Sequence, residues 1–165
     1  MSDPTAIALQ ADPLTQRFMG HAYNDPTQPF DVPFISHIEG NPWQGGCANG
    51  LVLPTNIEHI VSLYPWEQYQ ITHQPKSYSL HWLYDDASQE PPAIVHDIAA
   101  WVNVCLKDGP TLVHCQAGLN RSSLIAGLAL IKQGHAAADV IGLLREKRSP
   151  AVLCNKTFEK WLLQQ

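Results

Sequence analysis

The chain of 165 residues holds ten Lys and Arg residues against fifteen Asp and Glu residues, which gives a formal net charge of -5. This length suffices for one domain with a hydrophobic core, and so few basic residues form no stripe that would bind nucleic acid or an anionic membrane. No apolar run approaches the roughly 20 residues of a membrane-spanning helix, and the N-terminus lacks a signal-peptide pattern. We therefore expect a cytoplasmic protein with neither a nucleic-acid nor a membrane partner.

The N-terminal residues 1–34 are rich in Pro, Asp, Gln and Thr. This composition predicts an extended arm with little regular structure, ahead of a single domain at residues 35–165. Within that domain the apolar runs at residues 50–53 and 59–64 predict two strands separated by a turn, and residues 78–84 predict another.

Helical periodicity begins after Pro91 and Pro92. The apolar side chains that recur there at helical spacing should face the sheet, with the thiol in the core; they are Ile94, Ile98, Trp101, Val102 and Cys105.

The rest of the chain continues this alternation. Residues 111–113 predict a buried strand, and residues 124–131 predict a helix that Gly134 ends. Two more helices are expected, one around residues 140–144 and one that Asn155 caps. The pattern predicts an α/β fold whose central, largely parallel sheet is flanked by helices on both faces, with ligands bound at the carboxyl ends of strands.

The most informative segment lies at the carboxyl end of the strand at 111–113 and joins it to the helix at 124–131. It reads His114-Cys115-Gln116-Ala117-Gly118-Leu119-Asn120-Arg121-Ser122-Ser123. A loop in this position turns backbone N–H groups toward an anion, and the start of the following helix favours negative charge. We therefore expect residues 116–121 to bind a phosphate group.

The side chains of this loop offer further phosphate contacts and a nucleophile. Arg121 offers a planar fork that can grip two phosphoryl oxygens, and Gly118 allows close backbone approach or a positive φ angle. A helix N-terminus and a nearby cation favour the thiolate form of Cys115, which attacks phosphorus. Ser122 is placed to hydrogen-bond the sulfur, and His114 to orient the loop.

His114-Cys115-x-x-Gly118-x-x-Arg121-Ser122 resembles the signature of the cysteine-dependent protein tyrosine phosphatases, and the short chain is similar to their dual-specificity branch from about Ile35 to Phe158. The resemblance implies a phosphatase-like single domain that hydrolyses phosphotyrosine, and also phosphoserine and phosphothreonine, in phosphorylated protein substrates. It also implies a phosphocysteine intermediate and no cofactor.

Members of that family need a general acid that protonates the leaving oxygen, on a loop after an earlier strand. Here the segment is Trp82-Leu83-Tyr84-Asp85-Asp86, with Leu83 where proline is frequent. Spacing favours Asp86 as this acid, and Asp85 takes the role if the register differs by one residue. Arg148 has two interpretations. In some relatives a residue at the similar place helps to bind the substrate's phosphate, whereas an arginine in a connecting segment is often a solvated charge.

The remaining cysteines and the histidines form no metal-ligand array, so no metal site is expected. Several functions stay open at this point. Similar loops occur in phosphoinositide phosphatases and RNA 5′-triphosphatases, in catalytically inactive domains that only bind phosphorylated partners, and in rhodanese-like sulfur carriers. The natural substrate and the oligomeric state are not determined by the sequence.

Overall fold

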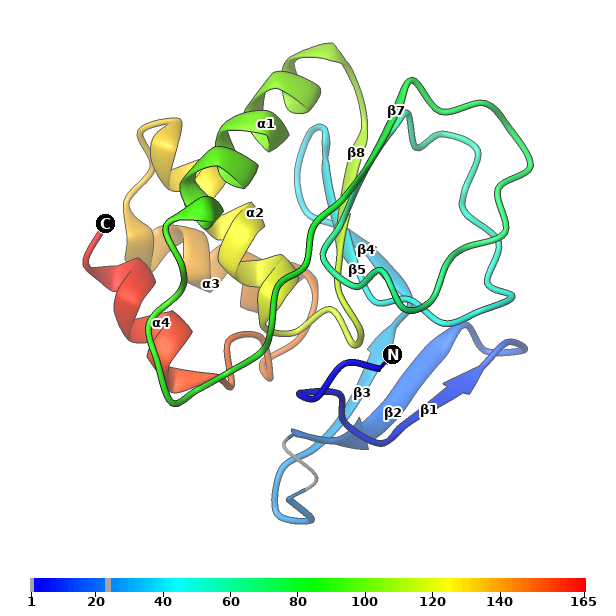
Figure 1. Cartoon of the computed structure of the whole chain (residues 1–165), viewed down its shortest axis with the longest axis horizontal. Coiled ribbons are helices and arrows are strands. Elements are labelled where there is room, and N and C mark those ends of the chain that lie inside the picture. The colour runs from blue at the N-terminus through cyan, green and yellow to red at the C-terminus, as the bar shows by residue number, and fades with distance from the viewer. Residues whose placement is uncertain (1, 23–24) are drawn as a thin grey trace.

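The structure is a computed structural model, and it describes residues 2–22 and 25–165. These residues form a three-stranded sheet, a five-stranded sheet and four helices (Figure 1). The strands are β1 (Leu9–Asp12), β2 (Arg17–His21), β3 (Pro29–Pro33), β4 (Ile35–His37), β5 (Pro42–Gly45), β6 (His59–Ser62), β7 (Ser77–Leu80) and β8 (Thr111–His114). The helices are α1 (Ile94–Asp108), α2 (Arg121–Lys132), α3 (Ala137–Lys147) and α4 (Lys156–Leu163).

The central sheet has the strand order β4-β5-β8-β6-β7. Strands β5, β8, β6 and β7 are parallel to their neighbours, and β4 pairs antiparallel with β5 at the edge. Every residue of β8 is buried, as expected for a central strand whose two faces are both covered. The predicted α/β class and the largely parallel sheet are therefore confirmed.

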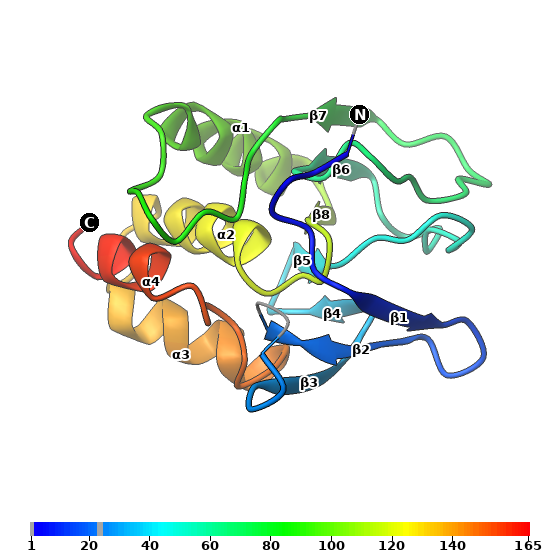
Figure 2. The same cartoon turned by 60° about the horizontal axis from the view of Figure 1, so that its bottom comes forward.

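The helices differ from the expected arrangement, because all four lie on the same side of the central sheet (Figures 1 and 2). The other side carries irregular segments at residues 46–58 and 63–76. The strand predicted at residues 50–53 was wrong, since this segment contributes one isolated bridge between Val52 and Gln70. Leu53 and Ile57 of the irregular segment at residues 46–58 are fully buried, so they cover the sheet without joining it.

The N-terminal region also differs from the expectation of little regular structure. Strands β1, β2 and β3 form an antiparallel sheet, and Gln16 takes a positive φ of 56° in the turn before β2. Phe18, Phe30 and Val32 from this sheet are buried in the same hydrophobic cluster as Leu112 of β8. Three buried side chains stabilise a sheet that composition alone does not reveal. The division of the chain at residue 34 stays a prediction.

The helices form largely where the periodicity predicts them. In α1 the buried face holds Val95, Ile98, Val102 and Cys105, at helical spacing. Ile94 and Trp101, which were expected to face the sheet, are instead 49% and 39% exposed. No described helix is both long enough and apolar enough to cross a membrane.

The C-terminal helix begins at the expected cap. The side chain of Asn155 accepts a hydrogen bond from the backbone N–H of Phe158 at 3.1 Å, which satisfies one of the unpaired donors of α4.

Candidate active site

The segment between β8 and α2 forms a tight loop at the carboxyl end of the central strand. Gly118 lies in this loop with a φ of +74°. A Cβ atom at this position would lie 2.5 Å from the carbonyl carbon of Gly45 and 2.5 Å from Nη2 of Arg148. Only glycine avoids both the unfavourable backbone conformation and these overlaps, so Gly118 fixes the curvature of the loop.

We expect Gly118→Ala to destabilise the fold by about 1–3 kcal/mol, because the left-handed backbone and the contact with Gly45 both oppose a methyl group. Thermal unfolding of the purified variant measures this effect. The control is Gly142→Ala in α3, where an added Cβ meets nothing within 4 Å. The control should be neutral or stabilise the fold by about 0.5–1 kcal/mol, and equal melting temperatures for both variants would contradict the assignment.

The inner surface of the loop offers unused hydrogen-bond donors. Among residues 2–22 and 25–165, no backbone acceptor or side chain pairs with the N–H groups of residues 116–120. Arg121 is 2% exposed, and Nε of its guanidinium has no partner within the same residues. Its Nη1 donates to the Leu83 carbonyl at 3.0 Å and to the Asp3 carboxylate at 2.7 Å. Unpaired donors of this kind are suited to bind an oxyanion.

Cys115 lies at the start of this loop, directly after β8. Its Sγ is 3.4 Å from Oγ of Ser122, in the first turn of α2. Gln44 of β5, which is fully buried, donates from Nε2 to the same Ser122 Oγ at 3.0 Å and to the Gly118 carbonyl at 3.1 Å. Since Ser122 accepts from Gln44, its own proton is free to point toward the sulfur. Sequence reasoning missed Gln44, which no motif marks.

His114, the last residue of β8, contacts the backbone at the start of the loop. Burial lowers the pKa of its imidazole to about 4, so the ring is neutral near pH 7. Its Nδ1 lies 3.2 Å from the Cys115 carbonyl, and the ring meets the Tyr69 ring edge to face. The neutral ring is therefore placed to hold the backbone at the cysteine.

Arg148 contacts the outer side of the loop. Its Nε donates to the Gly118 carbonyl at 2.6 Å, its Nη2 to the Ala117 carbonyl at 2.8 Å and its Nη1 to the Ser36 hydroxyl at 3.0 Å. Burial lowers the pKa of this guanidinium to about 10. Arg148 is therefore buried and is not the solvated charge considered above, while its contact with a phosphate stays a prediction. It satisfies loop carbonyls, which leaves the loop N–H groups to face the opposite way.

The two neighbouring aspartates lie in different surroundings. Asp85 accepts from Nδ2 of Asn120 at 2.8 Å and from Nδ2 of Asn155 at 2.8 Å, and burial raises the pKa of its carboxyl. The Asp86 carboxylate instead accepts from Ser88 and Gln89. The hydrogen bond from the Ser88 hydroxyl is the main reason why the pKa of Asp86 is lowered.

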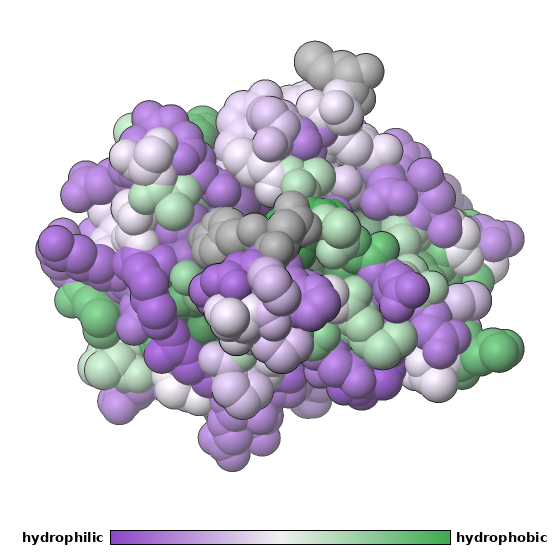
Figure 3. Space-filling view, turned by 90° about the horizontal axis from the view of Figure 1, so that it is seen from below, coloured by the Kyte–Doolittle hydropathy of each residue, from purple (hydrophilic) through white to green (hydrophobic). Residues whose placement is uncertain are grey.

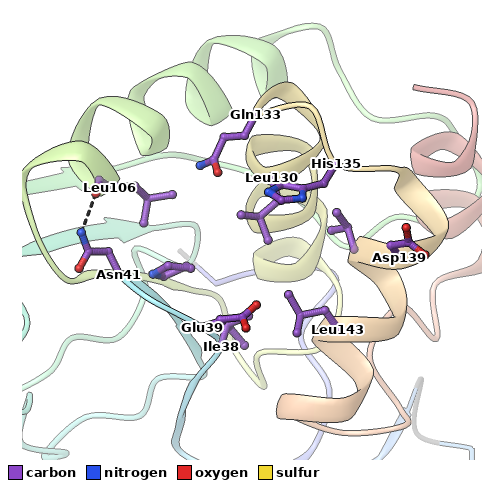
Figure 4. A pocket seen from close by; sticks show the side chains of 11 residues that line it. Ile38, Glu39, Asn41, Leu106, Leu130, Gln133, His135, Asp139 and Leu143 are labelled. Atoms are coloured by element: carbon purple, nitrogen blue, oxygen red, sulfur yellow. Dashed lines mark hydrogen bonds between the residues drawn. The ribbon is translucent and has the colours of Figure 1, made fainter.

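Asp85 and Cys115 line one small cavity of about 20 Å³, together with Ile7, Asn120 and Arg121. Asp86 lines a different cavity. A third cavity, of about 340 Å³, lies between the helices and the turn before β5 (Figure 4). Its wall includes Leu130 and Asp139, and it contains none of the site residues expected from the sequence. The cavity at Cys115 is therefore the candidate site.

One cluster of side chains in the described residues has the composition of a metal site, namely Glu58, His59 and Asp108. It lies at the start of β6, at the opposite end of the parallel sheet from Cys115. His59 donates to or accepts from Asp108 at 2.8 Å, and Lys76 pairs with both carboxylates at 3.1 Å. These mutual pairings account for the cluster, and we assign it no part in the candidate site.

A cysteine and an arginine at the two ends of an anion-binding loop, between a central parallel strand and a helix, define a phosphatase-like α/β protein. A family model described as dual specificity phosphatase, catalytic domain, matches residues 53–165, and the chain belongs to this family.

Two curated relatives illustrate the sequence similarity. The human protein tyrosine phosphatase type IVA 3 is 35% identical over 74 residues, which cover 43% of this chain and 43% of the relative. The protein tyrosine phosphatase PRL-1 of Leishmania major is 46% identical over 55 residues, which cover 32% of this chain and 30% of the relative. The chain thus spans less than half the length of the curated relatives it matches.

Solved structures show the same fold at lower identity. Human DUSP28 has a TM-score of 0.66 and 16% identity, and the match covers 78% of this chain and 93% of that chain. A mouse putative dual specificity phosphatase has a TM-score of 0.62 and 19% identity, with 80% and 87% covered.

Proposed function

We propose that the protein is a cysteine-dependent phosphomonoester hydrolase that acts on phosphotyrosine, and also on phosphoserine and phosphothreonine, in phosphorylated proteins. The observation that carries the proposal is the buried guanidinium of Arg121, whose Nε has no partner in the described residues and which shares a cavity with Cys115. A buried donor without a partner is unfavourable, and an anionic ligand in this cavity would supply the missing acceptor for Nε. The need for a reduced thiol agrees with the expected cytoplasmic location.

The first half of the reaction transfers the phosphoryl group to the enzyme. The Cys115 thiolate attacks phosphorus in line with the ester oxygen, forming an S–P bond as the P–O bond breaks. Arg121 and the N–H groups of residues 116–120 stabilise the charge on the three equatorial oxygens. The leaving oxygen takes a proton from a carboxylic acid, so an alcohol departs.

The second half returns the enzyme to its starting state. The carboxylate, now ionised, takes a proton from water, which attacks phosphorus and releases inorganic phosphate with a thiolate as leaving group. The Ser122 hydroxyl, 3.4 Å from the sulfur, stabilises the departing thiolate by donating a hydrogen bond. This cycle uses no metal or organic cofactor.

For the general acid we propose Asp85 in place of Asp86. An acid must be protonated in order to donate, so the rate falls as pH rises through its pKa. Burial raises the pKa of Asp85, whereas hydrogen bonds from Ser88 and Gln89 lower the pKa of Asp86. Only Asp85 shares the Cys115 cavity.

We expect Asp85→Asn to lower kcat by about 10²–10⁴-fold and to remove the loss of rate at high pH, because it removes the proton that the leaving group needs. The measurement is kcat against pH for an alkyl or weakly activated aryl phosphate. The neighbouring variant Asp86→Asn is the control and should stay within about threefold of the unchanged chain. If Asp86→Asn flattens the profile and Asp85→Asn does not, the original assignment from spacing is right.

A substrate panel tests the proposed function itself. Phosphotyrosine and phosphothreonine peptides, a phosphoinositide and an RNA 5′-triphosphate should be assayed beside p-nitrophenyl phosphate, with Cys115→Ser as the blank. We expect turnover of the aryl phosphate and the phosphopeptides. Turnover of the RNA or lipid alone would contradict the protein substrate, and binding of phosphopeptides without any turnover would identify a binding domain instead. The mouse structural neighbour is described as complexed with zinc tungstate, so tungstate is a suitable oxyanion probe.

A further inference from the structure

Residues 2–7, which we call the N-terminal strap, run across the open end of the loop between β8 and α2 before they continue into β1 (Figure 2). Asp3, Thr5 and Ile7 are turned toward the domain, and the residues between them are exposed. Each of these three residues contacts a different part of the proposed catalytic apparatus. These contacts hold the strap in one position on the domain. Asp3 and Ile7 each contact a side chain that lies more than 100 positions away in the sequence, as their separations of 118 and 109 positions show.

The first contact is an ion pair with the phosphate-binding arginine. Oδ2 of Asp3 accepts from Nη1 of Arg121 at 2.7 Å, and the two side chains are 0% and 3% exposed. A carboxylate presents two anionic oxygens to a guanidinium much as a phosphoryl group does. Asp3 thus holds a donor that a bound phosphate ester would require.

The second contact reaches the loop that carries the proposed general acid. Oγ1 of Thr5 donates to Oδ1 of Asp3 at 2.7 Å and accepts from the backbone N–H of Asp85 at 3.0 Å. The backbone N–H of Thr5 also donates to Oδ1 of Asp3 at 2.8 Å. These bonds fix the Asp3 carboxylate in place, so its ion pair loses little additional side-chain entropy.

The third contact involves the residue that follows the nucleophile. The side-chain amide of Gln116 accepts from the Ile7 N–H at 2.9 Å and donates to the Ile7 carbonyl at 2.8 Å. This paired geometry satisfies both backbone groups of one strap residue, as a neighbouring strand would. Gln116 therefore holds the strap backbone beside Cys115.

These contacts close the site. The cavity that Ile7 and Cys115 share holds about 20 Å³, which is room for roughly one water molecule and none for a phosphate ester. The buried carboxylate of Asp3 also compensates the charge of Arg121 and would repel an incoming phosphate dianion. A substrate reaches the loop only after Asp3 leaves it.

We propose that the N-terminal strap is an internal inhibitor of the phosphatase site, in which the Asp3 carboxylate occupies Arg121 in place of a substrate phosphate. The proposal rests on the proposed function, since it describes the regulation of the same site. A tethered segment competes at an effective concentration in the millimolar range. The inhibition is therefore competitive: it raises KM and leaves kcat unchanged, because the chemistry proceeds normally once the strap is displaced.

The variant Asp3→Asn tests this inference, since it keeps the size of the side chain and removes the charge. We expect its KM for p-nitrophenyl phosphate to fall about tenfold, with kcat within about twofold of the unchanged chain. The control is Asp12→Asn in β1, whose carboxylate accepts from the Leu14 N–H at 3.0 Å and is absent from the cavity at Cys115. An unchanged or raised KM in Asp3→Asn, or a lowered kcat, would overturn the proposal.

A second arm tests the strap as a separate molecule. Deletion of residues 2–7 should lower KM as Asp3→Asn does, and a synthetic peptide of residues 2–8 should inhibit the deleted enzyme competitively. The same peptide with Asp3→Ala should inhibit at least about tenfold more weakly, because it lacks the partner of Arg121. Equal inhibition by both peptides would show that Asp3 is not the group that occupies the arginine.

Tungstate binding separates the failure of this proposal from failure of the proposed function. Tryptophan fluorescence reports tungstate affinity without any turnover, and Asp3→Asn should bind tungstate about tenfold more tightly than the unchanged chain. If no variant hydrolyses any substrate but Asp3→Asn binds tungstate more tightly, the strap blocks an anion site in a protein that is not a phosphatase. Equal tungstate affinities would refute the strap proposal whatever the turnover.

Discussion

Replacement of Cys115 by serine should abolish measurable hydrolysis, with a fall in kcat of at least about 10⁴-fold. The serine hydroxyl is nearly isosteric with the thiol, but a hydroxyl ionises far less readily than a thiol, so it stays protonated at neutral pH and is a weak nucleophile. The oxyanion donors of the loop are untouched, so we expect tungstate to bind within about threefold of its affinity for the unchanged chain. Turnover of p-nitrophenyl phosphate and fluorescence titration with tungstate measure the two effects.

The matched control for this variant is Cys105→Ser. Cys105 lies in α1, is 1% exposed and has its Sγ 3.9 Å from Oγ of Ser77, away from the loop. The control should keep its kcat even where it lowers the melting temperature. Hydrolysis by Cys115→Ser at a rate close to that of the unchanged chain would exclude a covalent phosphocysteine.

Replacement of Arg121 by lysine has the second largest expected effect, although the charge is conserved. We expect kcat/KM to fall by about 10²–10³-fold, because an ammonium cannot donate along a planar fork to two phosphoryl oxygens. In the native site Nη1 donates to the Leu83 carbonyl at 3.0 Å, while Nε has no partner in the described residues and is available to a ligand. A lysine must abandon one of these partners, so both orientation and charge stabilisation are lost.

Arg145→Lys provides the comparison for this change. Arg145 donates from Nε to the Val152 carbonyl at 3.0 Å and from Nη2 to Glu159 at 2.6 Å, so it is an equally engaged arginine outside the loop. Its kcat/KM should be unchanged. Equal losses for the two lysine variants would mean that Arg121 supports the fold and does not bind the phosphate.

The anion-binding loop could be predicted from the sequence because its chemistry is local. Cys115, Gly118 and Arg121 are separated by few residues, and the strand and helix on either side fix how the loop turns. The contacts that complete the site are not local. Gln44 reaches Ser122 across 78 positions and Asp3 reaches Arg121 across 118, and no pattern along one chain reveals such pairs.

The choice between Asp85 and Asp86 shows a second reason why sequence spacing does not identify every site residue. Neighbouring residues in an extended segment point in opposite directions, so an error of one position moves a side chain from the site to the surface. The proposal of Asp85 rests on the partners of the two carboxylates, since Asn120 and Asn155 donate to Asp85 while Ser88 and Gln89 donate to Asp86. These partners come from distant segments for Asp85, and spacing alone does not identify them.

Asn155 connects α4 to the loop between β8 and α2 and to Asp85. Its Oδ1 caps α4, its Nδ2 holds the Asp85 carboxylate at 2.8 Å, and its backbone N–H donates to Asn120 in the loop at 2.9 Å. Docking of the C-terminal helix and alignment of the proposed acid, Asp85, therefore both depend on Asn155. A truncation just before Asn155 would leave every proposed catalytic side chain in the chain and should still abolish the proposed activity, because Asp85 and the loop between β8 and α2 would lose the residue that joins them.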